Sequence, residues 1–169
     1  MNGERFYTFR PKPGVRFFAL DSNYMDKSQL DWLEKELAAS GSDWKIAFFH
    51  HPLYSSGGTH GSDTQLREKL EPLFLKYGVD AVFSGHEHFY ERIKPQKGIT
   101  YFVNGSSGEL RKGDTKPSAM TAAHFDQDQA FSLVEVAGDD MYFEARSRTG
   151  KTVDSGVVHR QTSGQAVQP

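Results

Sequence analysis

Five of the seven histidines in this chain of 169 residues lie between positions 50 and 88. A neutral imidazole keeps one ring nitrogen free to coordinate zinc, iron or manganese, and the same ring exchanges protons near neutral pH. The cluster therefore suggests metal binding or acid–base catalysis, with ordinary surface exposure as the alternative. Its members are His50, His51, His60, His86 and His88.

The segment from Gly85 to His88 contains two histidines separated by one residue. We expect His86 and His88 to face two adjacent metal ions rather than to chelate one. The alternative is a polar loop with two solvated histidines, and the spacing alone does not separate these interpretations. We expect Glu87 to be solvated or to contact a ligand side chain rather than to coordinate a metal itself.

The pair His50 and His51 precedes Pro52, and we expect one ring to face the site while the other faces away. His60 follows on a loop rich in serine and glycine. A loop over a crevice suits an acid that contacts substrate, although a surface histidine fits the same pattern. His124 and His159 have no evident partner, and we expect them to be structural or surface residues.

Short apolar runs predict strands at 15–20, 45–49, 79–83 and 100–103. Helical spacing predicts helices at 27–39 and 64–77, with Asp26 as the N-cap of the first. Pro72 cannot donate a backbone hydrogen bond, so we expect a kink or break near Glu71. Helical connections between strands indicate parallel neighbours, which predicts an α/β fold.

Each of the four predicted strands ends in a polar segment. Because the carboxyl ends of parallel strands share one edge of a sheet, segments far apart in sequence are expected to meet there. Asp21, at the end of the first strand, suits either a catalytic role or an Asx turn. The other strands end at His50, Gly85 and Asn104.

The character of the sequence changes after residue 108. Residues 109–128 are polar and predicted to be irregular, whereas 131–137, 141–147 and 151–159 predict three strands. Their short connections indicate an antiparallel meander. We therefore expect one domain over residues 1–160, followed by a disordered tail at 161–169.

Composition narrows the class of partner. The chain has 20 Lys and Arg against 22 Asp and Glu, so it lacks the basic excess of a nucleic-acid binder. No run approaches the ~18 apolar residues of a membrane span, and no signal peptide is evident, so we expect no membrane partner. The absence of cysteine excludes disulfides and thiolate metal sites.

Two motifs resemble the second half of a calcineurin-like metallophosphoesterase, with the purple acid phosphatase branch as the best match. The resemblance covers almost the whole chain and implies part of an α/β/β/α sandwich that hydrolyses phosphoesters of small molecules. Relatives of this kind act on varied phosphomonoesters and are often exported. The motifs are His50-His51-Pro52-Leu53-Tyr54 and Gly85-His86-Glu87-His88-Phe89-Tyr90-Glu91-Arg92.

The resemblance also implies roles for individual residues. His50 and His86 match ligands of one metal in a pair of iron, zinc or manganese ions, and His88 matches a ligand of the other. His60 matches a proton-donating histidine that contacts substrate, whereas His51 matches no ligand. The aspartate motifs and the Asn-His motif of the family have no counterpart, so the chain resembles only its C-terminal portion.

Two cations held about 3.5–4 Å apart repel each other, and anionic ligands normally offset that repulsion. Since the matched ligands are neutral imidazoles, we expect at most one weakly held metal unless another chain supplies carboxylates. A missing half would also expose an apolar edge, which predicts a homodimer or association with an N-terminal half.

Three functions therefore remain open from the sequence. The first is a phosphoester hydrolase, or the C-terminal part of one. The second is a catalytically incomplete module that keeps the fold and some affinity for metal. The third is an α/β interaction protein whose histidines are incidental.

Overall fold

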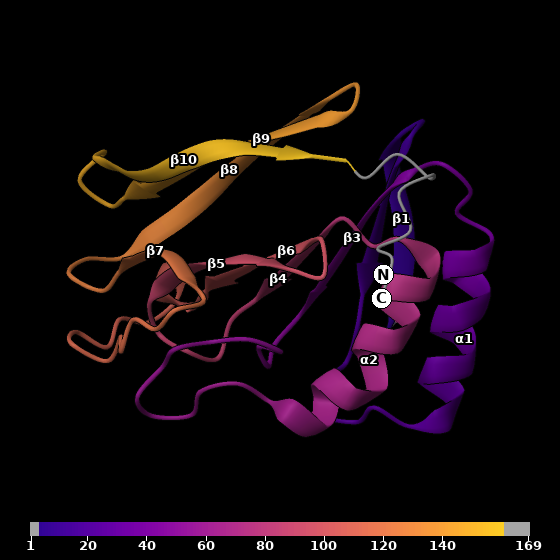
Figure 1. Cartoon of the computed structure of the whole chain (residues 1–169), viewed down its shortest axis with the longest axis horizontal. Coiled ribbons are helices and arrows are strands. Elements are labelled where there is room, and N and C mark those ends of the chain that lie inside the picture. The colour runs from indigo at the N-terminus through magenta and orange to yellow at the C-terminus, as the bar shows by residue number, and fades with distance from the viewer. Residues whose placement is uncertain (1–3, 161–169) are drawn as a thin grey trace.

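The computed structural model describes residues 4–160, so the tail predicted at 161–169 lies outside the described residues. The described chain has three layers: two helices, a seven-stranded sheet and a three-stranded sheet (Figure 1). The predicted mixed α/β fold with a closing meander is confirmed. The elements are β1 (Tyr7–Lys12), β2 (Val15–Ala19), α1 (Lys27–Ala38), β3 (Trp44–Phe49), α2 (Thr64–Tyr77), β4 (Ala81–Ser84), β5 (Tyr90–Gln96), β6 (Ile99–Asn104), a 3-10 turn (Gly105–Ser107), β7 (Thr121–Phe125), β8 (Ala130–Ala137), β9 (Asp140–Ser147) and β10 (Thr152–His159).

The large sheet has the strand order β1-β2-β3-β4-β6-β5-β7. Its centre is parallel, because β2 pairs with β3, β3 with β4 and β4 with β6 in the same direction. Strands β1, β5 and β7 are antiparallel to their neighbours. Strand β7 lies in the region expected to be irregular, which corrects that expectation, and β5 had no strand signal in the sequence.

Capping residues fix the ends of both helices. Asp26 accepts a hydrogen bond from the Gln29 amide at the start of α1, as predicted. At the start of α2, Asp63 accepts from the Leu66 amide. Helix α2 continues through Pro72 without a break and ends at Gly78, whose left-handed φ of +67° suits a residue without a Cβ.

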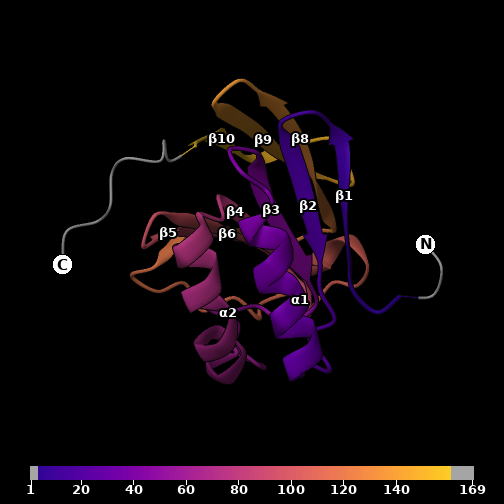
Figure 2. The ribbon, with the colours of Figure 1, turned by 90° about the vertical axis from the view of Figure 1, so that its right-hand side faces the viewer.

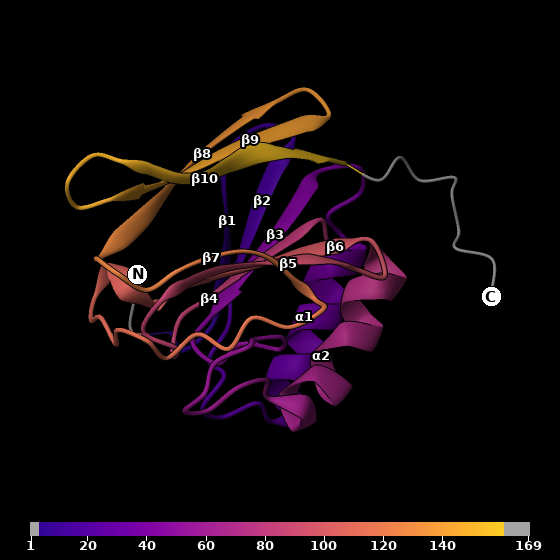
Figure 3. The same cartoon turned by 60° about the vertical axis from the view of Figure 1, so that its left-hand side comes forward.

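Two apolar cores lie on opposite faces of the large sheet. The helices cover one face, as Figure 2 shows, and Phe18, Leu33 and Phe74 are fully buried there. The three-stranded sheet covers part of the other face (Figure 3), where Trp44 and Phe102 are buried. Burial of this apolar surface is the main force that fixes the strand ends in place.

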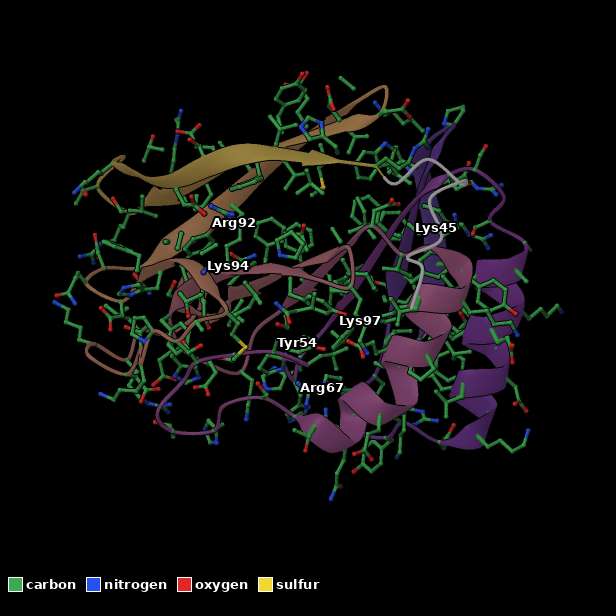
Figure 4. The ribbon with its side chains drawn as sticks, viewed as in Figure 1. Lys45, Tyr54, Arg67, Arg92, Lys94 and Lys97 are labelled. Carbon is green, nitrogen blue, oxygen red and sulfur yellow. The ribbon has the colours of Figure 1, made fainter. Side chains whose placement is uncertain are left out.

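A partly buried ionic contact joins the two sheets. Arg92 points from β5 toward β10 (Figure 4), where its Nε donates to Asp154 Oδ2 at 2.7 Å and its Nη2 donates to Oδ1 at 3.1 Å. The Tyr90 hydroxyl donates to the same carboxylate at 2.7 Å. Among residues 4–160, no helix is both long and apolar enough to cross a membrane.

Candidate metal centre

The histidines sit where β3 and β4 end side by side. Phe49 and Ser84 are register partners, and the Gly85 amide donates to the carbonyl of His50 at 3.0 Å. The chain then turns at His86, which has a left-handed φ of +64°, an uncommon conformation for a residue with a Cβ. This turn directs the His86 ring toward the end of β3, so parallel pairing brings together segments separated by 35 residues in the sequence.

His50 and His86 face each other across this junction. The distance between His50 Nε2 and His86 Nδ1 is 2.9 Å, and the ring centroids are 4.8 Å apart. Two ligands on one tetrahedral zinc ion would have nitrogens about 3.3–3.4 Å apart, given Zn–N bonds of about 2.0–2.1 Å. A small opening of the pair therefore suffices for both nitrogens to share one ion, and the donor set fits the metals of the resembled family.

His51 belongs to the same cluster, which differs from the expectation that one ring of the pair faces away. One coordinating atom from each of His50, His51 and His86 lies within 4.8 Å of the other two. The Nδ1 of His51 is 2.9 Å from the Ser22 hydroxyl oxygen, which also accepts from the His51 amide at 3.1 Å. With Nδ1 engaged in this contact, Nε2 is the His51 nitrogen available to a metal.

His88 lies outside this three-histidine group. Its Nδ1 is buried and, within the described chain, has no hydrogen-bond partner. The nearest carboxylate oxygen recorded for it belongs to Glu109, at 3.7 Å. A buried ring nitrogen without a partner is costly, so it fits a position that an ion would satisfy.

His60 reaches the cluster from the loop after β3. Its ring centroid lies 4.2 Å from that of His86, although its side chain remains exposed. The base of this loop is held by Tyr54, whose hydroxyl donates to Glu71 at 2.5 Å and whose ring faces the Arg67 guanidinium at 4.5 Å (Figure 4). The structure thus brings the predicted proton donor next to a predicted metal ligand.

Glu87 is not solvated, which was one of the two environments expected for it from the sequence. Its side chain is fully buried, and its Oε1 accepts hydrogen bonds from the amides of His60 and Gly61 at 3.1 and 2.5 Å. It therefore links the His86–His88 turn to the His60 loop. The only sequence signal for this role was the glycine-rich composition of that loop, which leaves amides accessible to a buried acceptor.

The surroundings of His50 and His86 favour the neutral form of these two imidazoles. Burial is the largest influence that lowers the pKa of His50, followed by His51 and His88. Burial, and then the nearby rings of His51 and His60, lower the pKa of His86 to about 4. A neutral ring at pH 7 has the lone pair that a metal requires.

The remaining polar residues at this edge have structural partners. Asp21 Oδ1 accepts from the Asn23 amide at 3.0 Å, which is the Asx turn that the sequence left open beside a catalytic role. Asn104 Oδ1 accepts from the Ser132 hydroxyl at 2.8 Å. The last two histidines lie on other strands. His159 pairs with Asp140 on the meander at 2.7 Å, and His124 is exposed on β7.

Comparisons with known proteins identify the family of this chain. A sequence model of the calcineurin-like phosphoesterase family matches residues 3–90. Tartrate-resistant acid phosphatase type 5 of Rattus norvegicus is 28% identical over 134 residues, which cover 75% of this chain and 41% of that enzyme. Purple acid phosphatase 15 of Arabidopsis thaliana is 36% identical over 121 residues, which cover 63% of this chain and 23% of that enzyme.

Solved structures show the same fold. A purple acid phosphatase from yellow lupin seeds superposes with a TM-score of 0.81 at 23% identity, covering 92% of this chain and 33% of that one. GAP50 of Plasmodium, described as the anchor in the inner membrane complex, superposes with a TM-score of 0.80 at 20% identity, covering 94% and 56%. The chain spans about two fifths or less of the length of the two curated relatives described above.

Proposed function

Because this chain belongs to the calcineurin-like phosphoesterase family, we propose that it forms the histidine side of a metal-dependent phosphomonoesterase site. The family consists of phosphoester hydrolases. The observation that carries the proposal is the convergence of His50 Nε2 and His86 Nδ1 at 2.9 Å on two adjacent strand ends. The substrate class that we propose is a small-molecule phosphomonoester.

His50 and His86 would hold one ion in this site, with His51 close enough to supply a third imidazole. His88, whose Nδ1 is buried without a partner in the described chain, would face a second ion only where another chain supplies carboxylates. When bound, a transition metal stabilises negative charge on the phosphoryl group and lowers the pKa of water. Iron and zinc are supported by the name of one relative, the Fe(3+)-Zn(2+) purple acid phosphatase 12 of Arabidopsis thaliana, which is 44% identical over 82 residues.

His60 is the proton donor in this proposal. Its exposed ring lies next to His86, so a substrate at the cluster would place its leaving-group oxygen within reach of an imidazole on the open side. Protonation of a departing oxygen by a positioned acid contributes typically 10²–10⁴-fold to a rate. The contribution is greatest for leaving groups that depart poorly without a proton.

The direct test is hydrolysis of an aryl phosphate by the purified chain with added zinc, iron or manganese. We expect hydrolysis that depends on the metal and is lost in His86→Ala. The matched control is His124→Ala, an exposed histidine on β7, which should retain activity. Activity that survives His86→Ala, or no activity with any of these metals, would contradict the proposal.

A specific comparison supports the second candidate, a metal-binding module without catalysis. GAP50 shares the fold with a TM-score of 0.80 and is described as an anchor rather than as a hydrolase. The matched ligands of this chain are imidazoles only, without the carboxylates that offset the charge of two ions. Metal binding without hydrolysis in the assay above would identify this function.

A further inference from the structure

The carboxylate of Glu87 is enclosed under the His60 loop, which we define as residues 55–62. Both recorded hydrogen bonds to this side chain come from that loop, namely from the amides of His60 and Gly61 to Oε1. The side chain has no exposed surface, and Oε2 has no hydrogen-bond partner among the described residues. The position of this part of the loop is therefore coupled to a residue located between two predicted metal ligands.

Two glycines lie directly against Glu87. A Cβ on Gly57 would lie 2.0 Å from Glu87 Oε1, so a larger residue there would displace the carboxylate from its observed position. On the backbone side, a Cβ on Gly105 would lie 2.0 Å from the Glu87 carbonyl oxygen. Two glycines from separate segments thus accommodate this one residue.

A second buried glutamate holds the other end of the same loop. Glu91 accepts from the amide of Ser56 at 2.9 Å and from its hydroxyl at 2.5 Å. Between these anchors, Gly58, Thr59 and His60 are exposed. Asp114 holds the first two of these, because its carbonyl accepts from the Gly58 amide at 2.8 Å and its Oδ1 accepts from the Thr59 hydroxyl at 2.7 Å. The backbone of His60 itself is held by Glu87.

We propose that Glu87 is a positioning residue, which fixes the His60 backbone so that the imidazole lies against His86. The proposal deepens the proposed function, since it rests on His60 acting as a proton donor to substrate. Glu87 itself touches neither substrate nor metal in this account. In the sequence Glu87 lies inside the predicted metal motif, whereas in the structure its carboxylate accepts hydrogen bonds from the loop.

The first test follows amide hydrogen exchange by NMR in the chain without added metal. In Glu87→Ala we expect the His60 and Gly61 amides to exchange at least about tenfold faster, because each loses its acceptor. The Ser56 amide, which is held by Glu91, should keep its exchange rate. Glu87→Gln keeps an oxygen acceptor and the side-chain volume, so it should give a smaller acceleration.

The control variant is Asp80→Asn, which alters a buried carboxylate that accepts from the Lys45 amide instead of the loop amides. We expect it to leave the exchange rates at His60 and Gly61 unchanged. If Glu87→Ala does not fold, Glu87→Gln carries the comparison with Asp80→Asn. Unchanged exchange at His60 and Gly61 in both Glu87 variants would overturn the proposal.

The second test compares two substrates in the metal-loaded chain. We expect Glu87→Ala to lower kcat for phenyl phosphate, a poor leaving group, about 10²-fold, while kcat for 4-nitrophenyl phosphate falls much less. His60→Ala should show the same leaving-group dependence, and Glu87→Gln should recover part of the loss. An equal loss for both substrates in Glu87→Ala would contradict positioning.

The two tests separate this inference from the proposed function. If the chain hydrolyses neither substrate, the proposed function fails, while the exchange measurement still decides whether Glu87 holds the loop. Hydrolysis could occur and depend on His60 while the Glu87 variants change neither amide exchange nor the leaving-group dependence of kcat. In that case only the positioning role is wrong.

Discussion

The two sheets of this molecule differ in how completely their apolar side chains are covered. In the large sheet, Phe18 and Phe102 are at most 1% exposed, because helices cover one face and the meander packs on the other. In the small sheet, Phe131 and Leu133 on β8 are 46% and 47% exposed. Helices therefore close one face of the large sheet, whereas its other face is covered only in part and leaves Phe9 43% exposed, and β8 of the small sheet keeps an apolar surface open.

The open surface lies next to a groove of about 490 Å³ between the two sheets. Aromatic side chains from β1–β4 form its floor, and Phe131 and Val134 of β8 form its wall. Exposed apolar surface of this kind is typical of an interaction face. The homodimer or N-terminal half expected from the sequence stays a prediction. The floor residues are Phe9, Phe17, Phe48 and Phe83.

The largest effect should come from truncating matched phenylalanines in the two sheets. Phe102→Ala removes a ring that stacks on Phe83 and contacts Phe143, so we expect a loss of about 3–5 kcal/mol in the free energy of unfolding. Phe131→Ala should cost about 1 kcal/mol or less, because half of this ring is already in water. Urea denaturation measures both, and equal losses would remove the distinction between the sheets.

A smaller effect on stability should come from Asp80, a buried carboxyl directly before β4. Burial is the main cause that raises the pKa of Asp80 to about 6, against a hydrogen bond from the Lys45 amide that lowers it. The folded state then binds more protons than the unfolded state between about pH 4 and 6, so this group makes stability fall as pH rises through that range.

The free energy of unfolding that is lost as Asp80 ionises is on the order of 3 kcal/mol, at about 1.4 kcal/mol per pKa unit. We expect Asp80→Asn to lose this pH dependence, so that its stability relative to the wild type improves from pH 4 to pH 6. Thermal unfolding across this range is the measurement. A constant difference between the two proteins would show that Asp80 titrates normally.

Much of the large sheet was predictable because its signals are local. Apolar runs and a capping aspartate define β2, β3, β4 and α1 without reference to distant residues. Strand β5 was missed because Glu91 and Arg92 read as polar loop, although Glu91 is fully buried and bonded to Ser56, and Arg92 pairs with Asp154. Such polar strands depend on partners that the local pattern does not identify.

The candidate site was predictable only in part for a similar reason. Topology correctly brought the ends of β3 and β4 together, so the contact between His50 and His86 follows from pattern and parallel pairing. The position of His51 depends on Ser22, and that of His60 depends on Glu87. These contacts join residues at least 27 positions apart, which no spacing rule identifies.

The smallest expected effect is on zinc affinity, and it tests which third imidazole binds the ion held by His50 and His86. We expect His51→Ala to weaken zinc binding about tenfold in competition titrations, since His51 lies with the other two rings. His88→Ala should leave this affinity nearly unchanged, because its ring lies outside the group. The reverse ranking would assign the first ion to His88 instead of His51.

The central claim is that the ends of β3 and β4 hold a metal through His50 and His86. The most direct measurement is the metal content and affinity of the purified chain after equilibration with zinc, alongside His86→Ala and the control His124→Ala. We predict one zinc ion per chain in the wild type and in His124→Ala, and none at the same zinc concentration in His86→Ala. Equal zinc content in His86→Ala and the wild type, or two tightly held ions per monomeric chain, would contradict the account.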